Sequence, residues 1–255
     1  MNTKDVFIFG TCRLCYPIHN NIIFVKELRK HHSRYYKIND NINIYTEPVN
    51  YTTKLIDVLD SIYYMKGKLY NFLNIKNEML QSIFFRGHVD FINPNTHPNL
   101  DISNIEYGKI IIEVFSIKQY IINTKKYGDE FYLQNLPWKI NTGYEHNGIT
   151  FDKNDIIIKH MNKEECFDIL HKIKQEVNCD IMIIGPYVSK KVPEFVNAER
   201  INTQNILKEF CLLYEWNYFD LSETIKHQDI ENDDTHFNSY GTQILSNEMY
   251  NFIME

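Results

Sequence analysis

One stretch, Asp5-Val6-Phe7-Ile8-Phe9-Gly10-Thr11-Cys12-Arg13, organises this chain of 255 residues. Its apolar run at 6–9 contains β-branched and aromatic residues, which predicts a buried strand. Gly10 breaks the run with a residue that tolerates any backbone conformation, and Thr11 is of the type that caps helix starts. A strand, a tight turn and a helix in succession lift the side chain of Cys12 to the carboxyl edge of a sheet, where open α/β sheets bind their ligands.

Cys12 is placed by this pattern in the first turn of a helix, beside Arg13. The helix dipole and the neighbouring guanidinium both favour a thiolate, which predicts a reactive cysteine. The alternative interpretation is that Cys12 is a small apolar filler, and the first stretch alone does not decide between the two.

The composition is that of a soluble globular protein, with 44% hydrophobic and 24% charged residues and a net charge of -6. No Lys/Arg block runs among the aromatic residues, so we do not expect nucleic acid as a partner. No apolar run approaches the length of about 18 residues that a membrane helix needs, and no signal-peptide pattern opens the chain. An odd number of cysteines, five, indicates reduced thiols, so we expect a cytoplasmic location. The single alanine, Ala198, beside abundant Asn, Ile, Lys and Tyr indicates an AT-rich genome, such as that of a large DNA virus or a parasite.

Strands and helices alternate along the predicted chain. Short apolar runs predict strands at 6–9, 42–45, 109–115, 180–184 and 218–219, and apolar periodicity predicts helices at 22–30, 51–65, 74–85, 162–177, 199–214 and 238–253. This alternation predicts a three-layer αβα sandwich with a parallel sheet of about five strands, formed by a single domain over 1–255. The irregular, aromatic segment near 127–151 is expected to be a lid or an insertion.

A carboxylate, Glu113, interrupts the third of these apolar runs. Inside a buried strand such a group must be paired or lie near the strand end. Ser116 and Lys118 come just past that end, so they are expected at the same edge of the sheet as Cys12. Ser116 has the alternative role of a helix cap.

The second chemical motif lies near the end of the chain, where Asp233 precedes His236 by three residues. At that spacing the carboxylate can accept a hydrogen bond from one imidazole nitrogen and fix the tautomer, which leaves the other nitrogen to take a proton from a nucleophile. Asp234 is the alternative orienting residue. The bland interpretation is that these residues only cap the last helix.

A nucleophile turn after the first strand, the D-x-x-H motif and the H-x-x-x-x-G spacing from His236 to Gly241 together resemble the SGNH/GDSL-type hydrolases. The resemblance implies an SGNH/flavodoxin-like fold and an acyl-ester hydrolase or acyltransferase, of the deacetylase or acetyltransferase type. By resemblance, Cys12 would be the nucleophile, His236 the base and Asp233 its orienting residue. The substrate would be a small-molecule or carbohydrate ester. No cofactor is implied, although acetyl-CoA is a candidate acyl donor.

Three departures from the family pattern concern the nucleophile, the G-x-N-D block and the glycine of the second block, which is not identifiable in this chain. Cysteine replaces the usual serine, which is similar to the GSCFA branch and to cysteine-bearing polysaccharide acetyltransferase relatives. The G-x-N-D block is missing, and Glu113-Val114-Phe115-Ser116 stands in its place. The resemblance therefore assigns oxyanion or substrate binding to the backbone N–H of Cys12 or Arg13, to Ser116 in place of the missing asparagine, and to Lys118.

Other classes of function remain open on the sequence. Cys12 and Cys15 form a C-x-x-C pair, the redox pattern of thioredoxin-like proteins, but that interpretation leaves the C-terminal motif unused. No metal site is predicted, because no second ligand pair has zinc spacing. A catalytically silent binding module of the same fold is favoured by the lost third block and opposed by the retained Asp233 and His236. The sequence leaves the acyl group, the acceptor and the oligomeric state open.

Overall fold

The computed structural model describes residues 4–10, 13–14, 17–18, 25–26, 35–39, 41–46, 54–65, 108–122, 131–132, 145–146, 149–150, 154, 156–189, 191–226 and 237–255. Two compact units share the chain. The first comprises Met1–Thr53, Glu106–Ser116 and Val177–Glu255, and the second comprises Lys54–Ile105 and Ile117–Glu176. The single domain expected over 1–255 stays a prediction.

The first unit is built on one seven-stranded sheet of order β12-β11-β5-β1-β4-β3-β2. Its strands are β1 (Lys4–Phe9), β2 (Val25–Lys26), β3 (Tyr35–Asn39), β4 (Ile42–Thr46), β5 (Lys109–Glu113), β11 (Asp180–Ile184) and β12 (Asn217–Phe219). The five from β12 to β4 are parallel, whereas β3 and β2 add an antiparallel edge. All five predicted strands are therefore confirmed, together with the parallel sheet. The helix predicted over 22–30 is wrong at Val25–Lys26, because pairing with β3 overrides a helical pattern made of β-branched residues.

The order of the parallel strands creates a switch point. If the five parallel strands β1, β4, β5, β11 and β12 are renumbered 1 to 5 along the sequence, their order across the sheet, starting from β4, is 2-1-3-4-5. This order is the flavodoxin-like arrangement. β1 has β4 on one side and β5 on the other, so the chain leaves β1 in one direction and later returns on the opposite side. In open α/β sheets the ligand crevice lies outside the carboxyl ends of the strands at this point.

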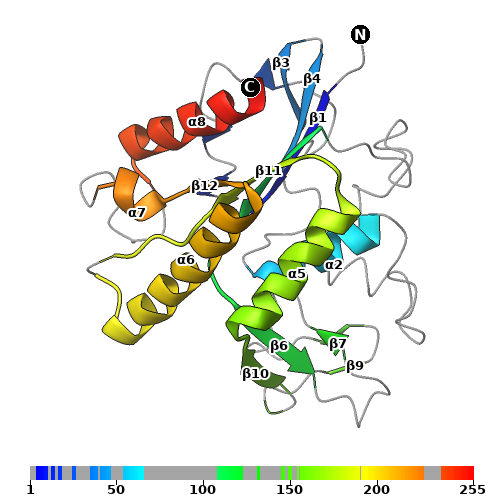
Figure 1. The fold of residues 1–255 in the computed structure, drawn as a ribbon, viewed down its shortest axis with the longest axis vertical. Helices are drawn as coiled ribbons and strands as arrows, with labels where there is room; N and C mark the ends of the chain where they lie inside the picture. Colours follow the sequence, from blue (N-terminus) through cyan, green and yellow to red (C-terminus); the bar gives the residue numbers. More distant parts are fainter. Residues whose placement is uncertain are drawn as a thin grey trace. The chain divides into compact units, whose positions relative to one another are not determined.

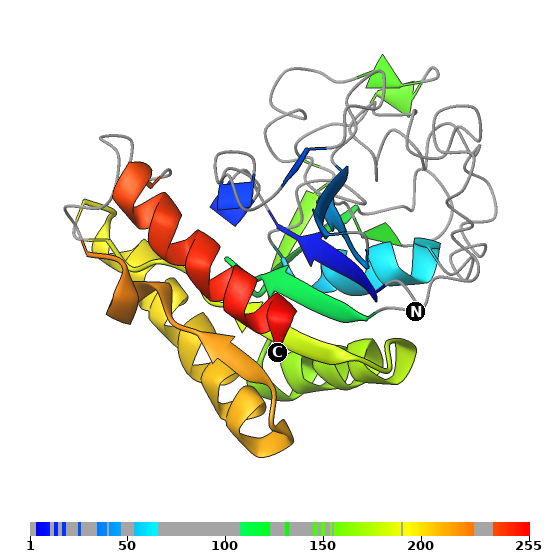
Figure 2. The same cartoon turned by 90° about the horizontal axis from the view of Figure 1, so that it is seen from above.

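Helices cover both faces of this sheet. The inner face of α8 (Ser239–Met254) packs into one core cluster with β1 and its neighbours, and Ile8, Ile111, Leu245 and Met249 are among its fully buried members. Phe219 belongs to the same cluster, whereas the preceding Tyr218 points to the opposite face, where Lys208 of α6 (Glu194–Tyr214) lies over its ring. Figures 1 and 2 show the strands of this unit between α8 and α6. The three-layer αβα arrangement is confirmed.

Both ends of α8 are satisfied by side chains. Asn238 caps the N-terminus by accepting hydrogen bonds from the backbone N–H groups of Tyr240 and Gly241, each at 3.0 Å. At the other end Lys109 Nζ, which is buried at the start of β5, donates to the carbonyl of Phe252 at 2.6 Å. A cation at a helix C-terminus also complements the helix dipole. The helix is thereby fixed to the sheet by more than apolar packing.

The second unit is smaller in its described part. Helices α2 (Leu55–Met65) and α5 (Lys163–Glu176) pack on each other, and β10 (Ile156–His160), β6 (Lys118–Ile122) and β7 (Phe131–Tyr132) form an antiparallel sheet. A short hairpin of β8 (Glu145–His146) and β9 (Ile149–Thr150) completes it. Within 127–151 only β7, β8 and β9 are described, and the lid expected there stays a prediction. In the described part of the chain, no helix combines the length and the apolarity needed to span a bilayer.

Candidate functional site

A buried ion pair joins β1 and β5 at the switch point. Glu113 is the last residue of β5, and Arg13 stands in a helical turn shortly after β1. Arg13 Nε lies 3.1 Å from Glu113 Oε1, and the two side chains are 9% and 0% exposed. The expectation that Glu113 is paired and near a strand end is confirmed. Burying two charges costs desolvation free energy, so a buried ion pair is an unusual feature at the carboxyl ends of central strands.

Gly10 is required here by space. A Cβ on Gly10 would lie 2.7 Å from Leu14 Cδ1 and 3.0 Å from Glu113 Oε2, both closer than ordinary van der Waals contacts. Its φ does not fall in the left-handed region, so the conformational freedom inferred from the sequence is not the reason for glycine. The missing side chain lets the Glu113 carboxylate approach the end of β1.

Phe115 lies between two guanidinium groups. Arg13 Cζ is 3.2 Å from the centroid of the Phe115 ring, and Arg200 Cζ, from α6, is 5.7 Å from it. Arg200 also donates from Nη1 to the carbonyl of Tyr187 at 2.7 Å. Cation–π contacts of this kind stabilise by roughly 0.5–2 kcal/mol each, depending on desolvation. The segment after β5 is thus connected to the segment after β1 and to the loop after β11.

The loop after β11 is held by hydrogen bonds from α6 and α7 (Leu221–Thr224). Gln204 Nε2 donates to the Pro186 carbonyl at 2.9 Å, and the Val188 N–H donates to Ser222 Oγ at 2.9 Å. These bonds fix the backbone on both sides of Tyr187, whose side chain is 6% exposed. A loop pinned in this way can present a side chain in one orientation.

Phe237 completes the group at this edge. Its ring packs edge-to-face on Tyr187, with centroids 6.4 Å apart and an interplanar angle of 78°. Contacts therefore run without interruption from Arg13 through Phe115, Arg200 and Tyr187 to Phe237. We call these five residues the edge group. It connects the segments that follow β1, β5 and β11 with the start of α8.

The predicted catalytic residues Cys12, Asp233 and His236 lie outside the described residues, as do Asp234 and Cys15. Their positions stay predictions. The residues that directly follow two of them, Arg13 after Cys12 and Phe237 after His236, are both members of the edge group.

The remaining predicted site residues fall in different units. Arg13 belongs to the edge group, and the half-buried Ser116 follows Phe115 directly. Lys118 instead begins β6 in the second unit. Phe115, Tyr187 and Arg200 were not predicted as site residues. The sequence signal for Phe115 was its place in the Glu113–Ser116 block, which stands where the G-x-N-D block is missing.

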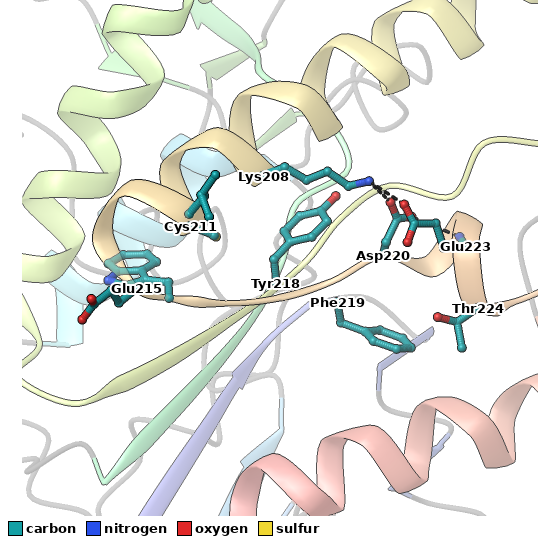
Figure 3. A pocket seen from close by; sticks show the side chains of 10 residues that line it. Lys208, Cys211, Glu215, Tyr218, Phe219, Asp220, Glu223 and Thr224 are labelled. Atoms are coloured by element: carbon teal, nitrogen blue, oxygen red, sulfur yellow. Dashed lines mark hydrogen bonds and ion pairs between the residues drawn. The ribbon is translucent and has the colours of Figure 1, made fainter.

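A separate pocket of about 770 Å³ opens beside the edge strand β12. Its lining comes from the end of α6, from β12 and from α7: Lys208, Cys211, Leu212, Glu215, Trp216, Tyr218, Phe219, Asp220, Glu223 and Thr224 (Figure 3). Its cation is paired within the pocket, since Lys208 contacts both Asp220 and Glu223. Burial raises the pKa of the Cys211 thiol to about 12, so this thiol is protonated and unreactive at neutral pH. None of the predicted site residues that the structure describes lines this pocket.

Comparisons with known proteins give similarity of structure only. No protein-family model and no curated protein matches the sequence. A Clostridium thermocellum family 3 carbohydrate esterase is similar with a TM-score of 0.41 and 10% identity, over 98% of this chain and 94% of that chain. The native aryl esterase of M. smegmatis is similar with a TM-score of 0.42 and 6% identity, over 99% of both chains. With identities and TM-scores this low, the two similarities carry no argument about the chemistry of this chain.

Proposed function

We propose that the chain is an acyl-ester hydrolase or acyltransferase with Cys12 as nucleophile, His236 as base and Asp233 as the residue that orients the imidazole. One observation carries the proposal. Arg13 and Phe237, the direct neighbours of Cys12 and His236 in the sequence, belong to one connected group of side chains in the first unit. Successive Cα atoms are about 3.8 Å apart, which supports the proposal that both halves of the motif lie near this edge.

The location supports the same reaction. The edge group surrounds the carboxyl ends of β1, β5 and β11, and β1 and β5 flank the switch point where open α/β sheets bind ligands. Arg13 and Glu113 pair across that point. The pocket beside β12 offers no comparable chemistry, because its thiol is protonated and its cation is paired.

The proposed reaction proceeds through a thioester. His236 takes the thiol proton of Cys12, and the thiolate sulfur attacks the acyl carbonyl to form a tetrahedral oxyanion. The backbone N–H of Cys12 or Arg13 and the Ser116 hydroxyl would donate hydrogen bonds to that oxyanion. Collapse releases the alcohol or thiol leaving group, which takes the proton from His236. Water or a hydroxyl acceptor, deprotonated by His236, then accepts the acyl group and restores the thiol.

The proposed substrate is a small-molecule or carbohydrate ester, with acetyl-CoA as a candidate acyl donor. This substrate class rests on the resemblance of the sequence motifs. Activation of the thiol is assigned to His236, because the charge of Arg13 is compensated by Glu113 at 3.1 Å. Arg13 is therefore expected to favour the Cys12 thiolate less strongly than the sequence alone suggested.

The test is an activity screen with short-chain p-nitrophenyl esters and acetyl-CoA. Cys12→Ala and His236→Ala should abolish turnover, and Asp233→Asn should lower kcat by a factor of up to about 10⁴, because it no longer holds the required tautomer. Cys15→Ser is the matched control, since it removes a nearby thiol that has no task in acyl transfer. Full activity in His236→Ala would contradict the triad.

The same set of variants separates the rival functions. Equal loss in Cys12→Ser and Cys15→Ser, together with disulfide-reductase activity in the parent, would indicate a redox pair. A parent that turns over none of these substrates would favour a binding module.

A further inference from the structure

The two ends of β5 each carry a buried charge, and the two charges have different surroundings. Lys109 begins the strand and Glu113 ends it, 5% and 0% exposed. Lys109 has a structural task, because it donates to the Phe252 carbonyl in the last turn of α8. Glu113 has its ion-pair partner Arg13 on the segment that follows β1. Its carboxylate therefore acts on the residue next to the proposed nucleophile.

A contribution to the free energy of folding does not explain why the buried Arg13–Glu113 pair is present here. The desolvation of two buried charges often exceeds their attraction, and apolar residues of similar volume are frequently as stable or more stable. What the pair does specify is orientation. The Arg13 guanidinium has two close neighbours, the Glu113 carboxylate, with Nε 3.1 Å from Oε1, and the Phe115 ring, whose centre lies 3.2 Å from Cζ.

The space around Glu113 is adapted to this task. Its Oε2 lies 3.0 Å from the position that a Cβ on Gly10 would take, so the end of β1 is built without a side chain to admit the carboxylate. Ile112, one residue before Glu113, pairs with Phe9, one residue before Gly10. This register brings Glu113 to the level of Gly10, which precedes Cys12 by two residues in the sequence.

We propose that Glu113 is a positioning residue of the site: it holds Arg13, and with it the turn after β1, in one orientation and compensates the charge beside the nucleophile. This inference rests on the proposed function, in which Cys12 is that nucleophile. The other described charge on Phe115 is Arg200, which lies on α6 and donates to Tyr187. Loss of Glu113 therefore removes the carboxylate that pairs with Arg13, a member of the edge group.

The first test separates positioning from stability. The double variant Arg13→Met/Glu113→Leu replaces the pair by apolar residues and should keep or raise Tm. If the pair positions the turn, kcat/KM of this folded variant should fall by about 10- to 100-fold, because small misplacements of reacting groups are costly. A folded double variant with the kcat/KM of the parent would overturn the inference.

The second test does not need turnover. Iodoacetamide alkylation of Cys12 is followed at pH 7 by mass spectrometry of its peptide, in Glu113→Gln and in Arg13→Gln/Glu113→Gln. With the carboxylate at 113 removed, the charge of Arg13 should favour the thiolate and speed alkylation by about tenfold, corresponding to about one pKa unit. In the double variant, which lacks the cation, this acceleration should disappear.

The outcomes are distinct. Equal rates in both variants would mean that the charge of Arg13 does not act on Cys12, and would overturn the charge-compensating role assigned to Glu113, as would no alkylation in Glu113→Gln. A third outcome is that the parent turns over no substrate, while the alkylation rate rises in Glu113→Gln and not in the double variant. This outcome would refute the proposed function and leave the role of Glu113 standing. Lys109→Met is the matched control on the same strand, and we expect it to lower Tm without changing the alkylation rate of Cys12.

Discussion

Gly185, which directly follows β11, provides a sharp test of packing around the edge. A Cβ at this position would lie 2.1 Å from Tyr218 Oη and 2.9 Å from Tyr218 Cζ. Neither distance is possible between non-bonded atoms, so Gly185→Ala must displace the ring or the strand. Overpacking of this kind costs about 1–3 kcal/mol.

The Tyr218 hydroxyl makes the test a double-mutant cycle. Its oxygen is buried, and among the described residues it has no hydrogen-bond partner. Burial accordingly raises the pKa of Tyr218. Tyr218→Phe removes the atom at 2.1 Å and gives up no hydrogen bond to the described residues, so it should be neutral or stabilising by up to about 1 kcal/mol.

In the double variant Gly185→Ala/Tyr218→Phe, the contacts with two ring carbons remain, at 2.9 and 3.3 Å. We therefore expect a coupling free energy of about 1–2 kcal/mol, measured by urea unfolding of the parent, the two single variants and the double variant. If Gly185→Ala alone costs less than about 0.5 kcal/mol, the ring can swing away from Gly185 and the reasoning is refuted. Additive single effects would refute it as well.

Two further predictions concern a helix cap and a half-buried carboxylate. Asn238→Ala removes the acceptor of two backbone N–H groups at the start of α8 and should cost about 1 kcal/mol, measured by urea unfolding, whereas an unchanged midpoint would contradict the cap. Burial raises the pKa of Asp5, and a hydrogen bond from Asn43 at 2.9 Å opposes the rise. Because the pKa of Asp5 is higher in the folded than in the unfolded chain, its contribution to stability is lost as pH rises from about 3.9 through the folded-state pKa. Asn43→Ala removes the opposing hydrogen bond and raises the folded-state pKa of Asp5 further. This variant should therefore lower Tm more at pH 7 than at pH 3. Equal losses of Tm at both pH values would contradict this assignment.

The central strands were predictable because of their burial. Strands of a parallel sheet that are covered on both faces are continuous apolar runs, as Ile110–Ile112 within β5 and Ile181–Ile184 within β11 illustrate. The strands outside this core gave weaker patterns. Ile157 and Ile158 of β10 are apolar, yet they are 50% and 56% exposed, and β2 has only two residues. Pairing with neighbours, which no local pattern encodes, decides such strands.

The site was predictable only in its parts. The carboxylate of Glu113 inside an apolar run and the arginine after Cys12 were both visible in the sequence. Their pairing depends on the register of β1 with β5, which becomes visible only with the sheet order. The contact of Arg200 with Phe115 depends on how α6 crosses the sheet, so no sequence spacing indicated it.

The two thiol environments explain why the carboxyl edge is the stronger candidate site. Cys211 lies in the pocket beside β12, where burial raises the pKa of its thiol to about 12 and the nearby cation Lys208 is committed to Asp220 and Glu223. A nucleophile needs the opposite, namely a base within reach and a local charge that does not oppose the thiolate. The edge group includes the residue after the predicted base His236, and its member Arg13 compensates the neighbouring Glu113 carboxylate. A volume large enough for a ligand is therefore less informative here than the pairing of buried charges at the switch point of the sheet.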